Sequence, residues 1–587
     1  MYEWKLNNVF KSVDEWKLAF NEAKQESNRV KEFKNTLNNK EGLEAFFSYQ
    51  NKLSKKLEVL YGFVALNRDR NTKELTYNSL LSEFMNLLND FEAKSSFVNS
   101  ELIKTPYETY LEFAKSSEII KNNLFSVKKL FDLREHILPE EQEKIIADYN
   151  STANGYADLY DSLMYQDYVI IPVTLTDGTT VEVSPNTYSS FLGRLEKQED
   201  RKRVFEALFG YYEKHKNTLA NIYKGVENAD LAYMKAKGYK NPVEAMLDNK
   251  KIPLEVYTSL INTVRENTAP LKRFIQIRKK YFGLEEYHTY DRILTIAGEG
   301  SVKYTYDEAY KQVLEALKPM GDDFVKHAKE TLEEGRVDVY PRDGKQGGAY
   351  STQIYGYGTY ILLNHTDDLE SAFTLAHECG HSIHTLYSNE NQPYETKDYE
   401  LFVAEIPSTF NEHLFLDHIL HTSKDKNVKL QAVEKQIMNI VSTFYRQTLF
   451  ADFEYQAHMK ALNGEALTYE VLDNIMTDLY QTYYGIDLNT EPLKKMVWAY
   501  IPHMYGTPFY VYQYATCFSA SSKIFNDIKN NVPGAFDNYI NMLKSGGKDY
   551  PVNLVKNGGA DLTTPAPFKA VCDSLNSLLD ELEELIK

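Results

Sequence analysis

Apolar residues recur every three to four positions along most of the chain, which is the spacing of amphipathic helices. The segment 75–98, LTYNSLLSEFMNLLNDFEAKSSFV, is a clear example of this pattern. Proline and glycine, which interrupt helices, are scarce over the first ~160 residues. The pattern therefore predicts long helices that pack on one another.

Two stretches interrupt the helical pattern. In residues 167–183, DYVIIPVTLTDGTTVEV, two β-branched runs flank Asp177-Gly178, a dipeptide suited to a hairpin turn. In residues 343–368, five glycines punctuate two strand-like runs, of which TYILLN (359–364) is the clearer. We predict a mainly α fold in which the second interruption forms a hairpin or small β-sheet.

The chain has 587 residues, too many for one compact core. We predict an N-terminal helical lobe over residues 1–190 and a second domain over residues 191–587. Hydrophobic residues make up 43% and charged residues 26%, as in ordinary soluble globular proteins. The net charge of -18 disfavours nucleic acid as a partner, because phosphates repel an acidic surface.

Targeting and redox features are absent from the sequence. The N-terminal residues show no basic stretch followed by an apolar core, so no secretory signal is predicted. No long uncharged apolar run predicts a membrane-spanning helix. The three cysteines, Cys379, Cys517 and Cys572, are far apart and form no CxxC pair. These observations predict a reduced, cytoplasmic protein that does not bind membranes.

The stretch TLAHECGHSIH, residues 374–384, holds three histidines and a glutamate. Asp367 is a candidate N-cap, and Glu370 three residues later completes a capping-box pattern. The residues that follow contain no proline and one glycine, up to a plausible terminator at Asn389. The motif is therefore predicted to lie on one helix of about five turns.

His377 and His381 would stand one turn apart on that helix, separated by ~6 Å along its axis. This spacing lets both imidazoles bind one zinc ion, and Glu378 would lie where it can take a proton from water. His384 lies ~10 Å from His377 along the axis, too far to share the same coordination shell. A polar helix face with two uncoordinated histidines would give the same sequence pattern.

A zinc peptidase needs a third protein ligand, and several downstream glutamates are candidates. Glu405 is set apart because it is an isolated acid in the apolar stretch LFVAEIPSTFNEHLF. Burying its carboxylate would cost several kcal/mol unless a cation pairs with it, and zinc would serve. The other candidates are Glu390, Glu395, Glu400 and Glu412.

These motifs together resemble the thimet-type zinc metallopeptidases, and within them the oligoendopeptidase F group. HECGH is followed 24 residues after its last histidine by Glu405 in AEIPST, similar to the Glu-x-Pro-Ser motif of that family. The stretches GGAYS, YILLN, AEIPSTFNEH and IPHMYGTPFYVYQYAT (501–516) extend the resemblance. It is strong over the second half of the chain, whereas the first half agrees in length and character.

The resemblance implies roles for further residues. Glu405 would be the third zinc ligand, and Glu412 would orient a zinc-bound histidine, although a surface carboxylate is an equal alternative. Hydrogen-bond donors to the developing oxyanion would come from residues 501–516. The implied donors are His503, Tyr505 and Tyr512, and the residues implied in substrate binding are Gly347, Gly348 and Tyr510, with Tyr510 also an alternative donor to Tyr512.

The resulting hypothesis is a zinc-dependent endopeptidase, with one zinc ion per chain, that hydrolyses internal bonds of short peptides. The resemblance implies a two-lobed helical body with a deep channel that closes on substrate. An exopeptidase of the same chemistry, such as a dipeptidyl carboxypeptidase, is one alternative. A non-catalytic peptide-binding protein with a structural zinc site is another, and Glu378 argues against it because a structural site needs no base.

Overall fold

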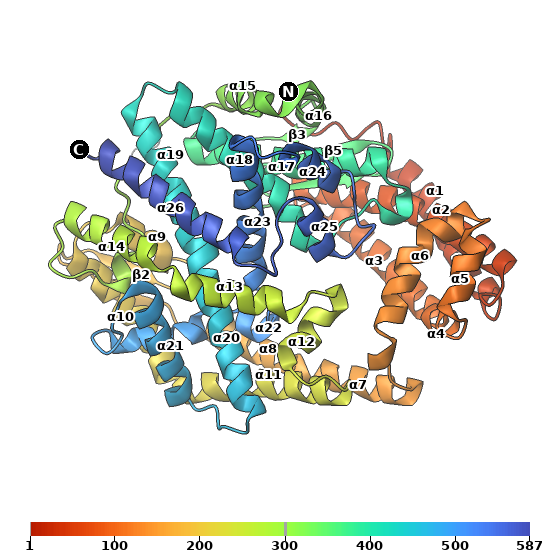
Figure 1. Cartoon of the computed structure of the whole chain (residues 1–587), viewed down its shortest axis with the longest axis horizontal. Coiled ribbons are helices and arrows are strands. Elements are labelled where there is room, and N and C mark those ends of the chain that lie inside the picture. The colour runs from red at the N-terminus through yellow and green to blue at the C-terminus, as the bar shows by residue number, and fades with distance from the viewer. Residues whose placement is uncertain (1, 299–301) are drawn as a thin grey trace. The chain divides into compact units, whose positions relative to one another are not determined.

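The computed structural model describes residues 2–298 and 302–587, with the side chains of residues 140, 147, 148, 150 and 151 left aside (Figure 1). Helices account for most of the chain, and the strands form two small sheets. The prediction of a mainly α fold is confirmed. In the described chain, no helix combines the length and apolar character needed to cross a membrane.

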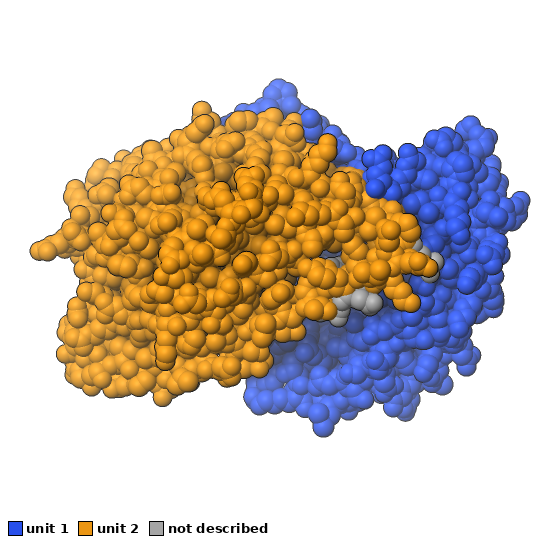
Figure 2. All heavy atoms as spheres, turned by 90° about the horizontal axis from the view of Figure 1, so that it is seen from below, with its two compact units in different colours: residues 1–135, 301–424, 524–559 blue, residues 136–300, 425–523, 560–587 orange. Residues whose placement is uncertain are grey.

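The chain forms two compact units, coloured separately in Figure 2. Each unit combines three segments that are distant in sequence, because helices pack through matching apolar faces rather than by order along the chain. The units therefore cut across the predicted domains 1–190 and 191–587. Unit 1 comprises Met1–Glu135, Ser301–Lys424 and Ile524–Gly559, and unit 2 comprises His136–Gly300, Asp425–Lys523 and Ala560–Lys587.

Unit 1 contains an N-terminal group of helices, a three-stranded sheet and the helices that follow it. The N-terminal helices are α1 (Val13–Ser27), α2 (Lys40–Arg70), α3 (Leu75–Ser95), α4 (Phe97–Leu102), α5 (Tyr107–Ala114) and α6 (Glu118–Asp132). The remaining elements are α15 (Tyr306–Leu317), α16 (Gly321–Thr331), β3 (Val337–Asp338), β4 (Tyr350–Ile354), β5 (Gly358–Leu362), α17 (Leu369–Asn391), α18 (Leu401–Thr422), α24 (Ala535–Leu543) and α25 (Pro551–Asn557).

The sheet of unit 1 has the strand order β3-β5-β4. β4 runs antiparallel to β5, with Tyr350 opposite Leu362, and β3 runs parallel to β5. α17 packs against β4 and β5, so the predicted small sheet does lie beside the helix that carries the histidines. Trp4 donates from Nε1 to the Ile361 carbonyl (2.8 Å), and Gly62 of α2 lies against Ile354. The N-terminal helices thus support the sheet that flanks α17.

Unit 2 is helical apart from one hairpin. Its elements are α7 (Glu140–Ala153), α8 (Gly155–Asp161), β1 (Ile171–Thr174), β2 (Thr180–Val183), α9 (Tyr188–Arg194), α10 (Gln198–Lys214), α11 (Lys216–Ala236), α12 (Pro242–Leu247), α13 (Leu254–Glu266), α14 (Ala269–Tyr281), α19 (Lys426–Asn439), α20 (Arg446–Leu462), α21 (Tyr469–Tyr484), the 3-10 helix η9 (Pro492–Tyr500), α22 (His503–Gly506) and α26 (Ala566–Leu585). α23 (Tyr512–Lys529) begins in unit 2 and ends in unit 1.

The hairpin of unit 2 matches the predicted one. β1 and β2 pair antiparallel, with Ile171 opposite Val183, and Gly178 in the turn has a φ of 91°. Aromatic residues tie the helices of this unit together. The phenol of Tyr257 donates to the Ala451 carbonyl (2.6 Å), and the phenol of Tyr160 donates to the Ala499 carbonyl (3.0 Å). These bonds satisfy the polar ends of large buried rings.

Candidate metal centre

The helix α17 begins one residue later than the sequence pattern predicted. Asp368 is the N-cap, and its Oδ1 accepts a hydrogen bond from the Ser371 N–H (2.7 Å). Asp367, the predicted cap, instead has a left-handed backbone with a φ of 55°, which short polar side chains tolerate. The helix continues to Asn391, two residues beyond the predicted terminator.

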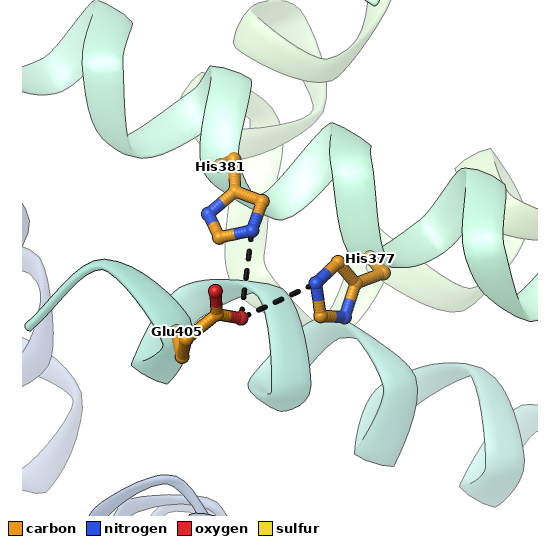
Figure 3. Close-up of side chains that lie close together, drawn as sticks. All are labelled: His377, His381 and Glu405. Atoms are coloured by element: carbon orange, nitrogen blue, oxygen red, sulfur yellow. Dashed lines mark ion pairs between the residues drawn. The ribbon is translucent and has the colours of Figure 1, made fainter. Parts of the chain in front are cut away.

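Three metal-ligating side chains converge between α17 and α18. His377 Nε2 lies 3.3 Å and His381 Nε2 lies 3.6 Å from the same oxygen, Oε2 of Glu405. Figure 3 shows the two rings projecting from α17 toward Glu405 on the neighbouring helix. One ligand atom from each residue lies within 4.8 Å of the others. Two imidazoles and a carboxylate are the donor set of a catalytic zinc site.

The close approach of α17 and α18 depends on small residues and side-chain hydrogen bonds. Gly380 faces Pro407, and a Cβ on Gly380 would lie only 2.4 Å from the Pro407 carbonyl oxygen. Asn411 Nδ2 donates to the Ala376 carbonyl (3.2 Å), which holds the two helices together. The Ser408 hydroxyl lies 3.1 Å from Glu405 Oε2. The sequence AEIPST thus places the glutamate within one turn of Pro407 and Ser408, which lie against Gly380 of α17.

Outer contacts orient the histidines toward Glu405. His377 Nδ1 is 2.6 Å from Glu412 Oε1, which leaves Nε2 for a metal ion. The other hydrogen bond of the His381 ring is to the Ala404 backbone carbonyl. Burial lowers the pKa of His381 to about 4, so this imidazole is neutral and available as a ligand. Burial also opposes the charge on Glu405, but its contacts with the two histidines hold the pKa of Glu405 at about 2.

Glu378 lies beside the triad and is only 5% exposed. The backbone N–H of Ser351 in β4 hydrogen-bonds to its carboxylate. Among the described residues, Glu378 Oε2 has no hydrogen-bond partner. Burial, reinforced by the charges of Glu405 and Glu412, raises the pKa of Glu378 to about 7, although His377 opposes the shift. A bound divalent cation would also oppose it. A carboxyl group with a pKa near neutrality can both accept and release a proton.

The residues present fit a zinc ion. The two histidines lie among three acidic groups, Glu378, Glu405 and Glu412. One protonated histidine, His377, cannot neutralise the negative charge of these carboxylates, whereas a divalent cation would. The ring of His377 and the ring of His381 both turn Nε2 toward the same carboxylate oxygen. The carboxylate of Glu378 feels the charges of His377, Glu405 and Glu412, and its Oε2 has no hydrogen-bond partner among the described residues. Zinc is therefore consistent with both the donor types and their arrangement.

His384 does not join the triad. It is fully buried, its ring stacks on Tyr399 with 3.6 Å between centroids, and neither ring nitrogen has a hydrogen-bond partner among the described residues. Gly347 and Gly348 precede β4 and are exposed, with nothing within 4 Å of a Cβ built on either residue. Gly348 has a φ of 81°, which favours glycine.

The other predicted site residues belong to unit 2. His503 and Tyr510 are partly exposed and lie in one aromatic cluster with Tyr514, which was not predicted; Tyr510 lies 6.0 Å from His503 and 5.4 Å from Tyr514 between centroids. Tyr505 and Tyr512 are buried, with exposures of 3% and 1%. Within this unit, the structure therefore separates the predicted donors into an accessible group and a buried group.

Sequence reasoning missed the residues that support the triad. Ser351 holds Glu378 from a strand, and its hydroxyl lies 2.7 Å from that of Ser382 on α17. Ser408 holds the carboxylate of Glu405 within α18, and Asn411 ties α18 to α17. Ser351, Ser382 and Asn411 are common polar residues whose partners lie more than 30 positions away, so no local pattern marks them, whereas the partner of Ser408 is only three residues away on the same helix. The only available signal was the position of Ser351 in GGAYS and of Ser408 in AEIPST.

A mainly helical protein with a His-Glu-x-x-His helix and a third acidic donor on the next helix has the fold and site of a metallopeptidase. Comparison with known families gives the same class. The sequence model of peptidase family M3 matches residues 191–574, and that of oligopeptidase F matches residues 101–169. The chain belongs to peptidase family M3 and is a metalloendopeptidase that hydrolyses peptides.

Individual relatives cover almost the whole chain. Oligopeptidase PepF of Bacillus subtilis (strain 168) is 33% identical, over 99% of this chain and 87% of that protein. The crystal structure of oligoendopeptidase-F from Enterococcus faecium is 27% identical with a TM-score of 0.74, and covers 98% of this chain and 99% of that one. A crystal structure of a Chlamydophila abortus protein is 30% identical with a TM-score of 0.92, over 99% and 98% of the two chains.

Proposed function

We propose that this protein is a zinc-dependent oligoendopeptidase that cleaves internal bonds of short peptides. The observation that carries the proposal is the convergence of His377, His381 and Glu405, with the buried carboxylate of Glu378 within reach of their charges. The three convergent residues would hold one zinc ion per chain. The relatives named oligopeptidase and oligoendopeptidase support short peptides as substrates.

The chain's own residues would handle the protons. A zinc ion held here would supply Lewis-acid chemistry. Glu378 would take a proton from the attacking water at Oε2 as the new carbon–oxygen bond forms. It would then give that proton to the leaving amine as the carbon–nitrogen bond breaks. Glu412 would keep the ring proton of His377 on Nδ1, so that the lone pair of Nε2 is available to a metal ion.

We propose His503 and Tyr510 as the hydrogen-bond donors to the developing oxyanion, because they are partly exposed. Tyr505 and Tyr512 were also predicted as donors, and their burial supports a packing role. Substituting Tyr505, Tyr510 and Tyr512 one at a time by phenylalanine would rank them as oxyanion donors. Loss of an oxyanion donor costs ~10²–10³-fold in kcat, whereas loss of a packing hydroxyl leaves kcat within a few-fold.

We propose that the free edge of β4 binds the peptide backbone in extended form. β4 pairs with β5 on one side and supplies the Ser351 N–H that holds Glu378. Exposed Gly347 and Gly348 next to this edge let a second backbone approach without meeting side chains. Main-chain hydrogen bonds of this kind tolerate many substrate sequences, which suits a peptidase of broad specificity.

The decisive experiment compares Glu378→Gln with the wild-type protein on a quenched fluorescent peptide of about ten residues. The variant should bind about one zinc ion per chain and lose turnover, and a chelator should abolish wild-type cleavage. Glu370→Gln is the matched control, since it makes the same change on an exposed residue of the same helix. Undiminished cleavage by Glu378→Gln would refute the proposal.

Blocking both ends of the peptide separates the competing activities. An endopeptidase cleaves the blocked peptide internally, whereas a dipeptidyl carboxypeptidase needs a free terminal carboxylate. Binding of the peptide without any cleavage would favour the non-catalytic alternative. Cys379, Cys517 and Cys572 are buried thiols rather than disulfides, which supports a reducing, cytoplasmic location that cell fractionation would test.

A further inference from the structure

Unit 2 contains a charged cluster in its core, built by α11 and α20. Glu227, Glu454 and His458 are each at most 1% exposed. His458 Nδ1 lies 3.0 Å from Glu227 Oε1, and its Nε2 lies 2.9 Å from Asp230 Oδ2. Burial lowers the pKa of His458, but the two carboxylates outweigh burial and raise it well above its ordinary value. Burying so many ionisable groups is costly, so their arrangement calls for a role.

The cluster holds one residue of the segment that connects α22 to α23. Glu454 Oε1 accepts a hydrogen bond from the Phe509 N–H (2.9 Å). The His458 ring lies 4.3 Å from the Phe509 ring between centroids. Phe509 has a φ of 57°, a left-handed conformation that bulky residues rarely adopt. Such a conformation persists only where the surroundings determine it; here Glu454 holds the backbone N–H, and the rings of His458 and Tyr257 (5.9 Å between centroids) pack against the side chain.

The backbone at Phe509 controls the side chains on either side of it. Tyr510 comes next in the chain, and its ring is nearly parallel to that of His503, with an interplanar angle of 7°. On the other side, Tyr505 stacks on Tyr160 with 4.0 Å between centroids and meets the edge of Tyr223 on α11. A change in the Phe509 backbone would therefore move Tyr510 relative to His503, while Tyr505 stays anchored.

We infer that Glu454 and His458 are positioning residues that fix Tyr510 relative to His503 by holding Phe509 in its left-handed conformation. The inference rests on the proposed function for the role of His503 and Tyr510 as donors to the reacting carbonyl. Neither Glu454 nor His458 needs to touch the substrate. The cluster acts through the backbone, so its effect should fall on turnover rather than on substrate binding.

The test compares two substitutions at one position. Glu454→Met removes the acceptor of the Phe509 N–H, whereas Glu454→Gln keeps an amide oxygen there. Burial raises the pKa of Glu454 to about 8, so glutamine closely replaces the neutral acid. Glu454→Met should lower kcat by about 10–100-fold with KM within about threefold and zinc content unchanged, because a small misplacement of a catalytic group costs about that much. Glu454→Gln should keep kcat within about fivefold.

Glu434 provides the matched control. It is a buried carboxylate of the same unit that also accepts backbone hydrogen bonds, from Ile296 and Ala297, and it contacts none of residues 503–514 in the interactions described. Glu434→Met should leave kcat within about threefold. Equal losses in the Met variants at positions 434 and 454 would show general destabilisation and overturn the inference. Equal losses in Glu454→Met and Glu454→Gln would also overturn it.

Hydrogen exchange of residues 503–514 gives a readout that does not depend on activity. Exchange should rise at least tenfold in Glu454→Met and stay unchanged in the Glu434→Met control. Unchanged exchange in Glu454→Met overturns the inference. The two proposals can fail separately. If exchange rises in Glu454→Met but the wild-type protein shows no chelator-sensitive cleavage, the positioning of residues 503–514 is supported and the proposed function is refuted. If Glu454→Met does not fold, Phe509→Pro replaces it, because proline has no N–H for Glu454 to accept and cannot adopt a positive φ. Unchanged exchange and kcat in that variant overturn the inference.

Discussion

Gly380 is the position where one added carbon atom should disturb the metal centre most. It lies between the two histidines on α17, and a Cβ there would be 2.4 Å from the Pro407 carbonyl oxygen and 2.7 Å from the Ser408 Cα. Non-bonded heavy atoms prefer about 3.5 Å, so Gly380→Ala requires the helices to separate by about 1 Å. Both obstructing atoms belong to the backbone and cannot rotate away.

The expected cost falls mainly on metal binding. Overpacking of this kind costs about 1–3 kcal/mol, but alanine gains about 1 kcal/mol over glycine inside a helix, so stability should fall by at most about 2 kcal/mol. Metal sites tolerate ligand shifts of about 0.2 Å. A separation of about 1 Å would carry Glu405 away from His377 and His381. We expect zinc affinity to fall at least ~100-fold, since disturbing an outer contact alone costs 10–100-fold.

Titration of zinc against a competing chelator measures this change, and urea unfolding measures the stability. Gly210→Ala in α10 is the matched control, because a Cβ there meets nothing within 4 Å. That variant should bind zinc normally and be as stable as the wild type or slightly more so. Wild-type zinc affinity in Gly380→Ala would refute the reasoning, because it would mean that α18 can retreat without moving Glu405.

Three further predictions concern the metal centre and the buried ion pair of Asp338 with Lys345. Glu412→Ala should weaken zinc binding by about 10–100-fold in the same titration, because His377 loses the acceptor at Nδ1. Removing zinc should lower the unfolding temperature of the wild type but not that of His381→Ala, in which the site is already broken. Asp338→Asn should cost about 3–5 kcal/mol in urea unfolding at neutral pH, because Lys345 is left buried without its carboxylate (2.7 Å). Although burial opposes it, hydrogen bonds from Arg342 and Lys345 keep the pKa of Asp338 low, so this deficit should shrink only below about pH 4.

Local patterns were sufficient to predict most of the fold. The hairpin β1–β2 follows from a turn dipeptide between β-branched runs, and its Gly178 has the positive φ that the turn needs. The N-cap of α17 was misplaced by one residue because Asp367 and Asp368 are equally good caps, and only the backbone shows which one caps. The parallel strand β3 (Val337–Asp338) has two residues, too few for any periodic signal.

The division into units could not be read from local patterns. Each unit joins three distant segments, and nothing in the composition of residues 130–140 or 420–430 marks the change from one unit to the other. The choice of packing partner depends on which apolar faces match in three dimensions. A local change of pattern, such as that used for the boundary at residue 190, carries no information about this exchange of segments, so the domains 1–190 and 191–587 stay a prediction.

The candidate site shows why some of its residues were visible in the sequence and others were not. The spacing of His377 and His381 is a property of one helix, so sequence alone suffices. The position of Glu405 depends on how α18 packs against α17, which no spacing within one helix predicts. The sequence marks this packing in another way, by residues that are unfavourable in a helix. Gly380 and Pro407 are each unfavourable inside a helix, yet they face one another where a Cβ on Gly380 would be only 2.4 Å from the Pro407 carbonyl oxygen. Phe509 is likewise strained, in the segment beside Tyr510. Locally unfavourable residues therefore mark the places where this chain gives up stability to hold its functional groups.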